Sequence, residues 1–239
     1  RTELTCISYN MHGYNQGCHT VRDLVLDRKP DIFILQEHWL TPNNLCKFEE
    51  NFPTYICAGS SAMNSCVESG VLRGRPFGGV MILVNNRFRQ CIQVVCAAER
   101  FVIVIIGDML IVNVYLPCSG ISNRLYICEE IFNDIAFWIR KYSDLKVLFG
   151  GDFNTDLDDN NVITLLINKF VKQHALHVCS SDLGKQCTYS NEALNRSSCI
   201  DYFFCSESLV TSPVEVLDLD ANLSDHHPIC VKCLCDIGD

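Results

Sequence analysis

Residues 101–117 read FVIVIIGDMLIVNVYLP, an apolar run that Gly107 and Asp108 interrupt near its middle. Each half has the length of a β-strand, and a Gly beside an Asp is a common turn signal. Neither half approaches the roughly 18 apolar residues that a membrane-spanning helix needs. We therefore interpret this stretch as two strands joined by a turn.

More strand-like runs lie on both sides of this pair. Two come directly before it, at 78–84 and 91–97, and the others are 4–11, 31–39, 146–153, 187–190, 199–205 and 226–234. Apolar residues three and four apart predict helices around 21–25, from about 122 to 138, and around 162–170. Because several strands at a time separate these helices, the order favours two packed sheets with helices outside them over a regularly alternating barrel.

The length of 239 residues and the hydrophobic content of 48% allow one large α/β core. We predict a single domain spanning residues 1–239. Since the sequence begins with Arg1, we expect this domain to be cut from a longer polypeptide. No secretory signal pattern opens it, so we expect a protein that is not secreted and not membrane-bound. The stretch 58–76 is predicted to be a surface loop.

The sixteen cysteines first suggest a disulfide scaffold, but such scaffolds are short chains with little other core. Here several cysteines fall within strand-like runs, where a free thiol serves as a small apolar side chain. A zinc site at Cys230, Cys233 and Cys235 is rejected because no second cysteine pair accompanies them and strand spacing explains them equally well.

The net charge of −9 argues against a protein that coats nucleic acid, since that affinity comes mainly from Lys and Arg. It does not exclude an enzyme that meets DNA through a local basic surface. Acidic side chains are also the ligands that a hard divalent cation requires.

Polar residues stand at the ends of the predicted strands, where a rigid scaffold can direct them into a shared cleft. Each alone has an ordinary explanation, such as a turn, a surface charge or a capped buried acid. The positions concerned are Asn10, Glu37, Tyr115, Asp152, Asn154, Asp201, Asp225 and His226.

In chain order, the motifs SYN, LQE, NVY, GGDFN, SCIDY and LSDHHPI resemble those of the endonuclease/exonuclease/phosphatase superfamily. Within it, NMHGYNQG, ILQEHWL, RGRPFGGV and GGDFNTDLD are most similar to the endonuclease domain of non-LTR (LINE-type) retrotransposons. The resemblance implies a four-layer α/β sandwich, in which two packed mixed β-sheets are flanked by helices and the active site lies at one rim.

The resemblance also implies a role for each residue. A bound Mg²⁺, for which Mn²⁺ would substitute, is expected on Glu37, with Asn10 and Asp225 close by; carboxylates and amides suit this ion. Asp152 would orient or deprotonate the attacking water, Asn154 and Tyr115 would hold the phosphate, and His226 would stabilise its developing charge. Asp201 would fix the tautomer of His226.

Three further positions lie close to these residues in the sequence, namely His12, Cys199 and His227. Adjacent strand residues point to opposite faces, so His227 is not expected to share the role of His226. Many relatives carry Asp or Asn where this chain has His12, which puts a water-mediated metal contact from that position in doubt. Several carry a basic residue where this chain has Cys199, which removes one possible phosphate contact.

Contacts with double-stranded DNA are predicted on three loops. The resemblance places a groove-entering finger at 190–198, a predicted hairpin loop. The candidate DNA-binding residues are Arg73, Arg75, Arg124, Asn195, Arg196 and Ser198.

The sequence thus predicts a Mg²⁺-dependent endonuclease that nicks one DNA strand, leaves 3′-hydroxyl and 5′-phosphate ends, and serves target-primed retrotransposition. We expect it in the nucleus, reached through the cytoplasm, with the reverse transcriptase of the same polyprotein as a partner in cis. The alternatives are a repair endonuclease for apurinic/apyrimidinic DNA, an inositol-lipid or sphingomyelin phosphoesterase, and a binding module without catalysis.

Overall fold

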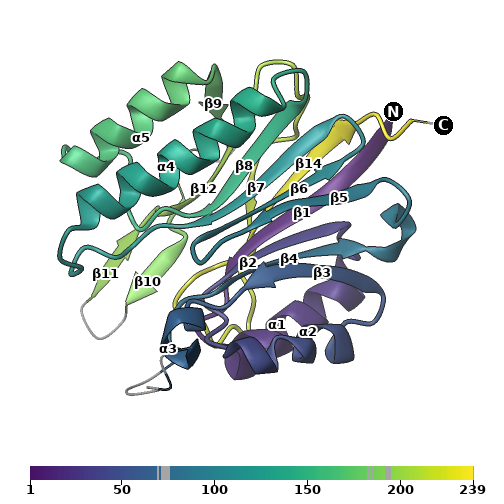
Figure 1. The fold of residues 1–239 in the computed structure, drawn as a ribbon, viewed down its shortest axis with the longest axis horizontal. Coiled ribbons are helices and arrows are strands. Elements are labelled where there is room, and N and C mark those ends of the chain that lie inside the picture. The colour runs from purple at the N-terminus through teal and green to yellow at the C-terminus, as the bar shows by residue number, and fades with distance from the viewer. Residues whose placement is uncertain (69, 71–75, 182–183, 185, 192–194, 239) are drawn as a thin grey trace.

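Two six-stranded β-sheets pack face to face, and helices cover the outer face of each sheet (Figure 1). The computed structural model describes residues 1–68, 70, 76–181, 184, 186–191 and 195–238. Both sheets are mixed, because each contains one parallel pair of strands among antiparallel neighbours.

The first sheet is built from the two ends of the chain and its N-terminal half. Its strands, in spatial order, are β13 (Glu215–Val216), β14 (Ile229–Cys235), β1 (Thr2–Asn10), β2 (Ile32–Gln36), β4 (Val80–Asn85) and β3 (Tyr55–Ser60). Strands β1 and β2 are parallel, and the crossover between them contains α1 (Tyr14–Asp27). The same layer holds α2 (Cys46–Asn51), with the 3-10 turn η1 (Pro42–Asn44) before it.

The second sheet is built from the middle and C-terminal half. Its strands, in spatial order, are β5 (Ile92–Ala97), β6 (Phe101–Ile106), β7 (Met109–Tyr115), β8 (Lys146–Asp152), β12 (Asp201–Ser206) and β9 (Leu176–Val178). Strands β7 and β8 are parallel, and α4 (Arg124–Lys141) connects them. Helix α5 (Val162–Gln173) packs beside α4 on the outer face.

Three smaller elements complete the structure. They are the short helix α3 (Asn64–Glu68), the 3-10 turn η2 (Asn86–Phe88), and an antiparallel hairpin of β10 (Tyr189–Asn191) and β11 (Arg196–Ser198). In Figure 1 the hairpin extends from one end of the molecule.

Strand β6 shows why the central strands are apolar on both faces. Val102 and Val104 pack between the two sheets, whereas Ile103 and Ile105 pack against the layer that contains α4 and α5. A third apolar cluster lies between the first sheet and α1 and α2. A strand that is covered on both faces is expected to be continuously hydrophobic.

The predicted fold class is confirmed: two packed mixed sheets are flanked by helices. The stretch 101–117 forms β6 and β7, with the turn at Gly107, which has a φ of 55°. The three predicted helices are α1, α4 and α5, although α1 starts seven residues before the first apolar residue that predicted it, at Tyr14 and not Val21.

The prediction of one structureless loop over 58–76 is wrong in part, because its first residues belong to β3 and 64–68 form α3. Strands β3, β9, β11 and β13 and helices α2 and α3 were not predicted. The prediction of a loop over 190–198 is wrong in part, because Arg196–Ser198 form β11 and pair with β10. The cysteines whose side chains the structure describes are free thiols, and most of them are buried or half-buried. Within the described part of the chain, no helix combines the length and the hydrophobicity required to cross a bilayer.

Candidate active site

The ends of four strands from both sheets meet at one rim. Asn10 ends β1, Glu37 follows β2, Tyr115 ends β7 and Asp152 ends β8. Each of the two parallel pairs places both of its strand ends at this rim. The amide of Asn10 joins the two sheets there, since it donates hydrogen bonds to Asp152 Oδ2 at 2.8 Å and to Glu37 Oε1 at 3.3 Å.

A buried polar bridge supports this rim from below. Gln36 Nε2 in β2 donates to Asn113 Oδ1 in β7 at 2.7 Å, and both residues have no exposed surface. Asn113 in turn donates to the carbonyl oxygens of Leu35 and Met81, at 2.9 Å and 3.0 Å. These bonds fix the separation of the sheets next to Glu37 and Tyr115.

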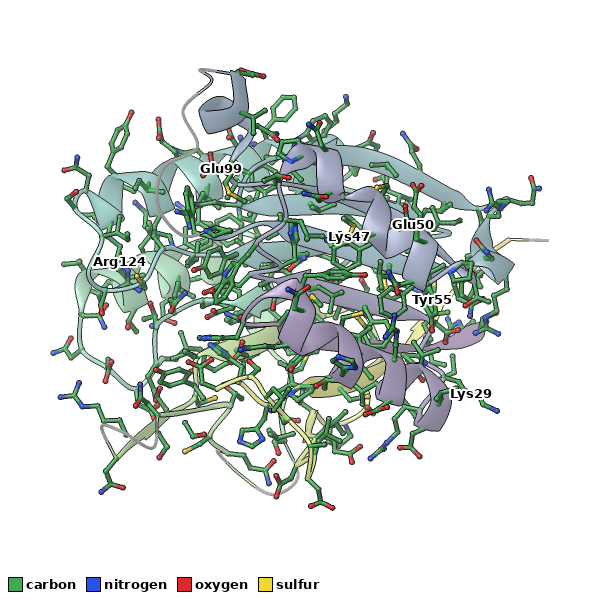
Figure 2. All side chains as sticks on the ribbon, turned by 90° about the horizontal axis from the view of Figure 1, so that it is seen from below. Lys29, Lys47, Glu50, Tyr55, Glu99 and Arg124 are labelled. Atoms are coloured by element: carbon green, nitrogen blue, oxygen red, sulfur yellow. The ribbon has the colours of Figure 1, made fainter. Side chains whose placement is uncertain are left out.

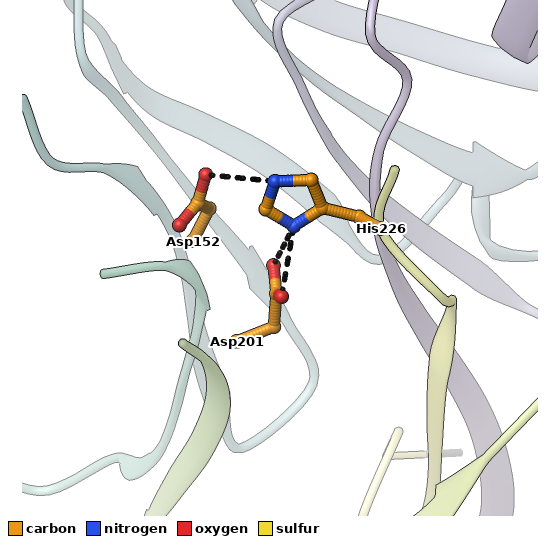
Figure 3. Close-up of side chains that lie close together, drawn as sticks. All are labelled: Asp152, Asp201 and His226. Atoms are coloured by element: carbon orange, nitrogen blue, oxygen red, sulfur yellow. Dashed lines mark hydrogen bonds and ion pairs between the residues drawn. The ribbon is translucent and has the colours of Figure 1, made fainter. Parts of the chain in front are cut away.

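Three buried side chains form a row in the centre of the site (Figure 3). His226 Nδ1 lies 2.9 Å and 3.2 Å from the two carboxylate oxygens of Asp201. On the other side of the ring, Nε2 lies 3.9 Å from Asp152 Oδ2. The hydroxyl of Thr188 accepts from the backbone N–H of Asp201 at 3.1 Å, which holds the start of β12 in place. This row is the arrangement of an oriented imidazole between two carboxylates.

The charges in this row shift its proton affinities. Burial alone would lower the pKa of His226, but the carboxylates of Asp201 and Asp152 outweigh it and raise the pKa to about 10. Burial raises the pKa of Asp152 to about 7, while His226 and the hydrogen bond from Asn10 act in the opposite direction. At neutral pH the imidazole is therefore a cationic donor beside a carboxyl group that gains a proton readily.

Glu37 is held by three donors. Besides Asn10, the hydroxyl of Tyr115 donates to Oε1 at 2.6 Å and the indole Nε1 of Trp39 donates to Oε2 at 3.0 Å. Glu37 and Trp39 both have left-handed backbone, with φ of 53° and 56°, which is uncommon for such residues. Burial, followed by the charge of Glu37, raises the pKa of Tyr115, so its phenol stays a neutral donor.

Asn154 and Arg124 lie on the wall next to Asp152. The amide of Asn154 donates to Leu116 O at 2.8 Å and to Asp152 Oδ2 at 3.2 Å, and its backbone N–H donates to Asp152 Oδ1 at 2.7 Å. Arg124 Nη2 donates to Asn154 O and Thr155 Oγ1, both at 2.7 Å. Arg124 thus holds the loop that carries Asn154. It lies toward the end of the molecule opposite Lys29 (Figure 2).

Asp225 lies beside two imidazoles. Its Oδ1 is 3.0 Å from His12 Nδ1 and 4.0 Å from His226 Nε2. Although burial alone would raise the pKa of Asp225, its contacts with His12 and His226 lower it. Ser224 fixes this turn, since its hydroxyl donates to Asn10 O at 2.8 Å and accepts from the backbone N–H of His226 at 3.1 Å.

The residues at the rim fit a hard divalent cation. Asp225 Oδ1 is a buried oxygen without an aligned hydrogen bond, and the Glu37 carboxylate lines the same pocket. Across the part of the chain that the structure describes, the one group of three or more His, Cys, Asp or Glu side chains with ligand atoms within 4.8 Å of one another is Asp152, Asp201 and His226. Because His226 Nδ1 is engaged by Asp201, that group suits proton transfer better than a cation.

The site opens into a pocket of about 860 Å³. His12, Glu37, Asp225 and His226 line it, and so do four of the six candidate DNA-binding residues: Arg124, Asn195, Arg196 and Ser198. Asn195, Arg196 and Ser198 belong to the β10–β11 hairpin and its turn, and Tyr189 of the same hairpin packs its ring 5.1 Å from that of His226. Arg73 and Arg75 lie outside the described residues.

Two further positions that the sequence analysis considered are His227 and Cys199. His227 is half-buried, and its Nδ1 faces the exposed Asp218 at 3.9 Å. Cys199 is buried, and its backbone N–H donates to Asp156 Oδ2 at 3.2 Å.

The sequence patterns did not single out Gln36, Trp39, Asn113 or Thr188. The only signal for Asn113 was an amide inside an otherwise apolar strand, and a buried amide needs partners.

The chain is similar to several solved nucleases and phosphatases. The 3′ phosphatase NExo from Neisseria, bound to a product DNA hairpin, has 17% identity and a TM-score of 0.73, over 98% of this chain and 99% of that one. The endonuclease domain of TRAS1, a telomere-specific non-LTR retrotransposon, has 16% identity and a TM-score of 0.70, over 97% and 98%. The AP endonuclease LMAP from Leishmania major has 14% identity and a TM-score of 0.76, over 96% and 87%. At these identities the likeness shows the fold.

No curated protein sequence matches the chain. The model of the Endonuclease/Exonuclease/phosphatase family matches residues 7–226. The matched range contains all eight polar candidates of the sequence analysis, from Asn10 to His226. The prediction of a hydrolytic enzyme that acts on phosphoesters is confirmed at the level of this family: the chain belongs to the Endonuclease/Exonuclease/phosphatase family.

Proposed function

We propose that this chain is a Mg²⁺-dependent DNA endonuclease that nicks one strand and leaves 3′-hydroxyl and 5′-phosphate ends. The observation that carries the proposal is the common pocket. Glu37, His226 and Arg196 of the hairpin all line it, and the buried Asp152 lies 3.9 Å from His226. A duplex whose groove receives the hairpin would present one backbone to these groups.

In this proposal, the buried Asp152, held by Asn10 and Asn154, orients and deprotonates the attacking water. The imidazolium of His226 donates from Nε2 to the scissile phosphate, while Asp201 keeps Nδ1 protonated. Tyr115 donates its neutral hydroxyl to Glu37 and thereby orients that carboxylate. Glu37 and Asp225 would hold the cation, with Asn10 orienting Glu37. Such a cation neutralises the charge on the non-bridging oxygens when it is bound.

The proposed biological setting is target-primed retrotransposition, in which the 3′-hydroxyl end serves as a primer. The similarity to the TRAS1 endonuclease domain and the hairpin at the mouth of the pocket support this setting. It includes a nuclear location reached through the cytoplasm and a reverse transcriptase in the same polyprotein.

A plasmid assay tests the proposal. The purified chain should convert supercoiled plasmid to the open circle in Mg²⁺ and not in EDTA, and a DNA polymerase should extend the nicks without prior treatment. Substituting Asp152 or His226 by Ala should lower nicking by at least roughly 10³-fold, whereas the exposed Asp23→Asn should not change it. Plasmid that stays supercoiled in Mg²⁺ would refute the proposal.

The same preparation separates the alternatives. Strong preference for an abasic over an intact duplex would assign the site to repair. Phosphate release from a phosphoinositide, without nicking, would assign it to lipid hydrolysis. Tight DNA binding without any cleavage would identify a binding module.

A further inference from the structure

The turn that carries His226 lies outside both six-stranded sheets, and the base of the β10–β11 hairpin holds it. The backbone N–H of Ser190 donates to Asp225 O at 2.8 Å. On the other side of His226, the backbone N–H of His227 donates to Thr188 O at 2.7 Å. The hairpin that extends from one end of the molecule (Figure 1) is therefore bonded to the chain immediately before and after the catalytic imidazole.

Tyr189 lies between the two hairpin residues that make these bonds. Tyr189 and His226 form an isolated antiparallel β-bridge, and their rings meet edge to face, with centroids 5.1 Å apart and an interplanar angle of 62°. His226 is buried, whereas Tyr189 is half-buried and lines the same pocket. Asp201 bonds one nitrogen of the imidazole, but Tyr189 packs against the ring itself and thereby restricts its rotation.

The hairpin base also reaches the acid that orients the imidazole. The hydroxyl of Thr188 accepts from the backbone N–H groups of Ile200 and Asp201, both at 3.1 Å. The backbone N–H of Thr188 donates to Ser198 O at 3.0 Å. A shift of the hairpin would thus displace both Asp201 and His226. A misplacement of about 1 Å in an active site can slow a reaction by roughly 10²-fold.

We propose that Tyr189 is a positioning residue: its ring holds the imidazole of His226 in place and ties it to the hairpin that faces DNA. The inference rests on the role of His226 in the proposed function and adds the residue that keeps this ring in position. Tyr189 acts through His226 and not on the phosphate, so its loss should slow nicking without weakening the binding of DNA.

The first measurement needs neither DNA nor a cation. In the chain labelled with ¹⁵N-histidine, the proton on Nδ1 of His226 should give a sharp NMR resonance, because its bond to Asp201 protects it from exchange with water. Tyr189→Ala should broaden this resonance, and Tyr189→Phe should retain it because the ring stays in place. Tyr142→Ala removes a half-buried aromatic ring from the end of α4, so it is the matched control and should leave the resonance sharp.

The second measurement separates catalysis from binding. Tyr189→Ala should lower the single-turnover rate of nicking at saturating duplex by about 10²-fold. The Kd for the same duplex, measured by fluorescence anisotropy in EDTA, should change by less than about threefold. Tyr189→Phe and Tyr142→Ala should both keep the wild-type rate.

The inference fails if the Nδ1 resonance is already broad in the wild type or stays sharp in Tyr189→Ala. It also fails if Tyr189→Ala raises the Kd for the duplex as much as it lowers the rate, because Tyr189 would then be a contact surface for DNA. A Tyr189→Phe variant as slow as Tyr189→Ala would assign the effect to the hydroxyl and overturn the role of the ring.

If thermal melting shows that Tyr189→Ala is unfolded, Tyr189→Leu takes its place with the same expectations, since it fills the space without an aromatic ring. The two proposals fail separately. A wild-type chain that does not nick, but whose resonance broadens in Tyr189→Ala, overturns the proposed function alone. Nicking at an unaltered rate in Tyr189→Ala overturns the inference alone.

Discussion

The carboxylate of Asp201 lies 2.9 Å from Nδ1 of His226, while Nε2 of the same ring faces Asp152 at 3.9 Å (Figure 3). The ring is therefore oriented from one side and free to act on the other. A carboxylate in this position fixes the tautomer and stabilises the imidazolium.

Asp201→Asn should lower the rate of nicking by roughly 10²- to 10⁴-fold, since the amide cannot stabilise the imidazolium. The same change should lower the pKa of His226, which now lies at about 10. Single-turnover nicking and NMR titration of the imidazole measure the two effects. A full rate with an unchanged imidazole pKa would contradict the role assigned to Asp201, and Asp23→Asn serves as the control.

Arg196 and Arg124 should differ in their effects on DNA binding. Arg196 is exposed on the hairpin, so Arg196→Ala should weaken binding and reduce the slope of log K against log salt by about 1. Arg124→Ala should instead lower the nicking rate, because it releases the carbonyl of Asn154. Fluorescence anisotropy at several salt concentrations distinguishes them, with the exposed Lys169→Ala of α5 as control. If Arg196→Ala and Arg124→Ala reduced the slope of log K against log salt equally, the two arginines would not differ in their roles in DNA binding.

Trp39→Phe keeps an aromatic ring against His12 but removes the indole N–H that donates to Glu37 Oε2 at 3.0 Å. A hydrogen bond to a charged group contributes about 1.5–3 kcal/mol, so cation affinity should fall by roughly tenfold or more. Titration with Mn²⁺ measures it. Trp138→Phe, on α4 at the far face of the second sheet, should leave affinity unchanged. Equal affinities in the two variants would show that Glu37 does not depend on Trp39.

Asn113→Ala should lower the free energy of unfolding by about 2–4 kcal/mol, because it removes three buried hydrogen bonds: those from Asn113 to the carbonyls of Leu35 and Met81, and the one that Asn113 accepts from Gln36. Urea denaturation measures the loss. Gln93→Ala, at an exposed position in β5, should change stability by less than about 0.5 kcal/mol. Similar values for both variants would deny the bridge its structural role.

His38 should make the fold sensitive to acid. Burial lowers the pKa of His38 to about 4, and its ring accepts from the backbone N–H of Leu40 and pairs with Ser60 O. Since the unfolded chain binds the proton near pH 6.5, the stabilisation is complete above that pH and is lost as pH falls toward 4. The loss should reach about 2 kcal/mol at pH 5.

Urea denaturation at pH 7.5 and pH 5 checks this effect. His38→Gln should show a smaller difference between the two pH values than the wild type, while the exposed His19→Gln should not. An unchanged difference in His38→Gln would assign the acid sensitivity to other groups.

The sequence predicted the parts of the fold that depend on long apolar patterns. Strands β6 and β7 are buried on both faces, so their composition left little ambiguity. Strand β3 was not predicted because it contains Gly59, and a glycine within a short run weakens the pattern of a strand. The structure requires this glycine, since a Cβ at position 59 would lie 2.4 Å from Val80 O. Strands β9 and β13 have three and two residues, which is too short for any period to appear.

The candidate site divides in a similar way. Asn10, Glu37, Asp152 and His226 were found because each is a polar residue at the end of an apolar run. The contact of Trp39 with Glu37 and that of His12 with Asp225 depend on left-handed backbone and on tertiary packing. Neither leaves a periodic signal in the chain. The sequence likewise does not reveal that the side-chain amide of Asn154 donates to both Leu116 O and Asp152 Oδ2.

Strand β1 begins at Thr2, beside Cys235 of β14, and ends at Asn10 in the catalytic rim. At about 3.3 Å per residue, this strand separates the termini from the chemistry by roughly 25–30 Å. Both ends of the chain emerge at the same pole, away from the hairpin (Figure 1). Polypeptide attached to either terminus would lie on the side away from the hairpin and would not obstruct a duplex that approaches the pocket. Because the two termini lie close together, a short linker between them would permit circular permutation.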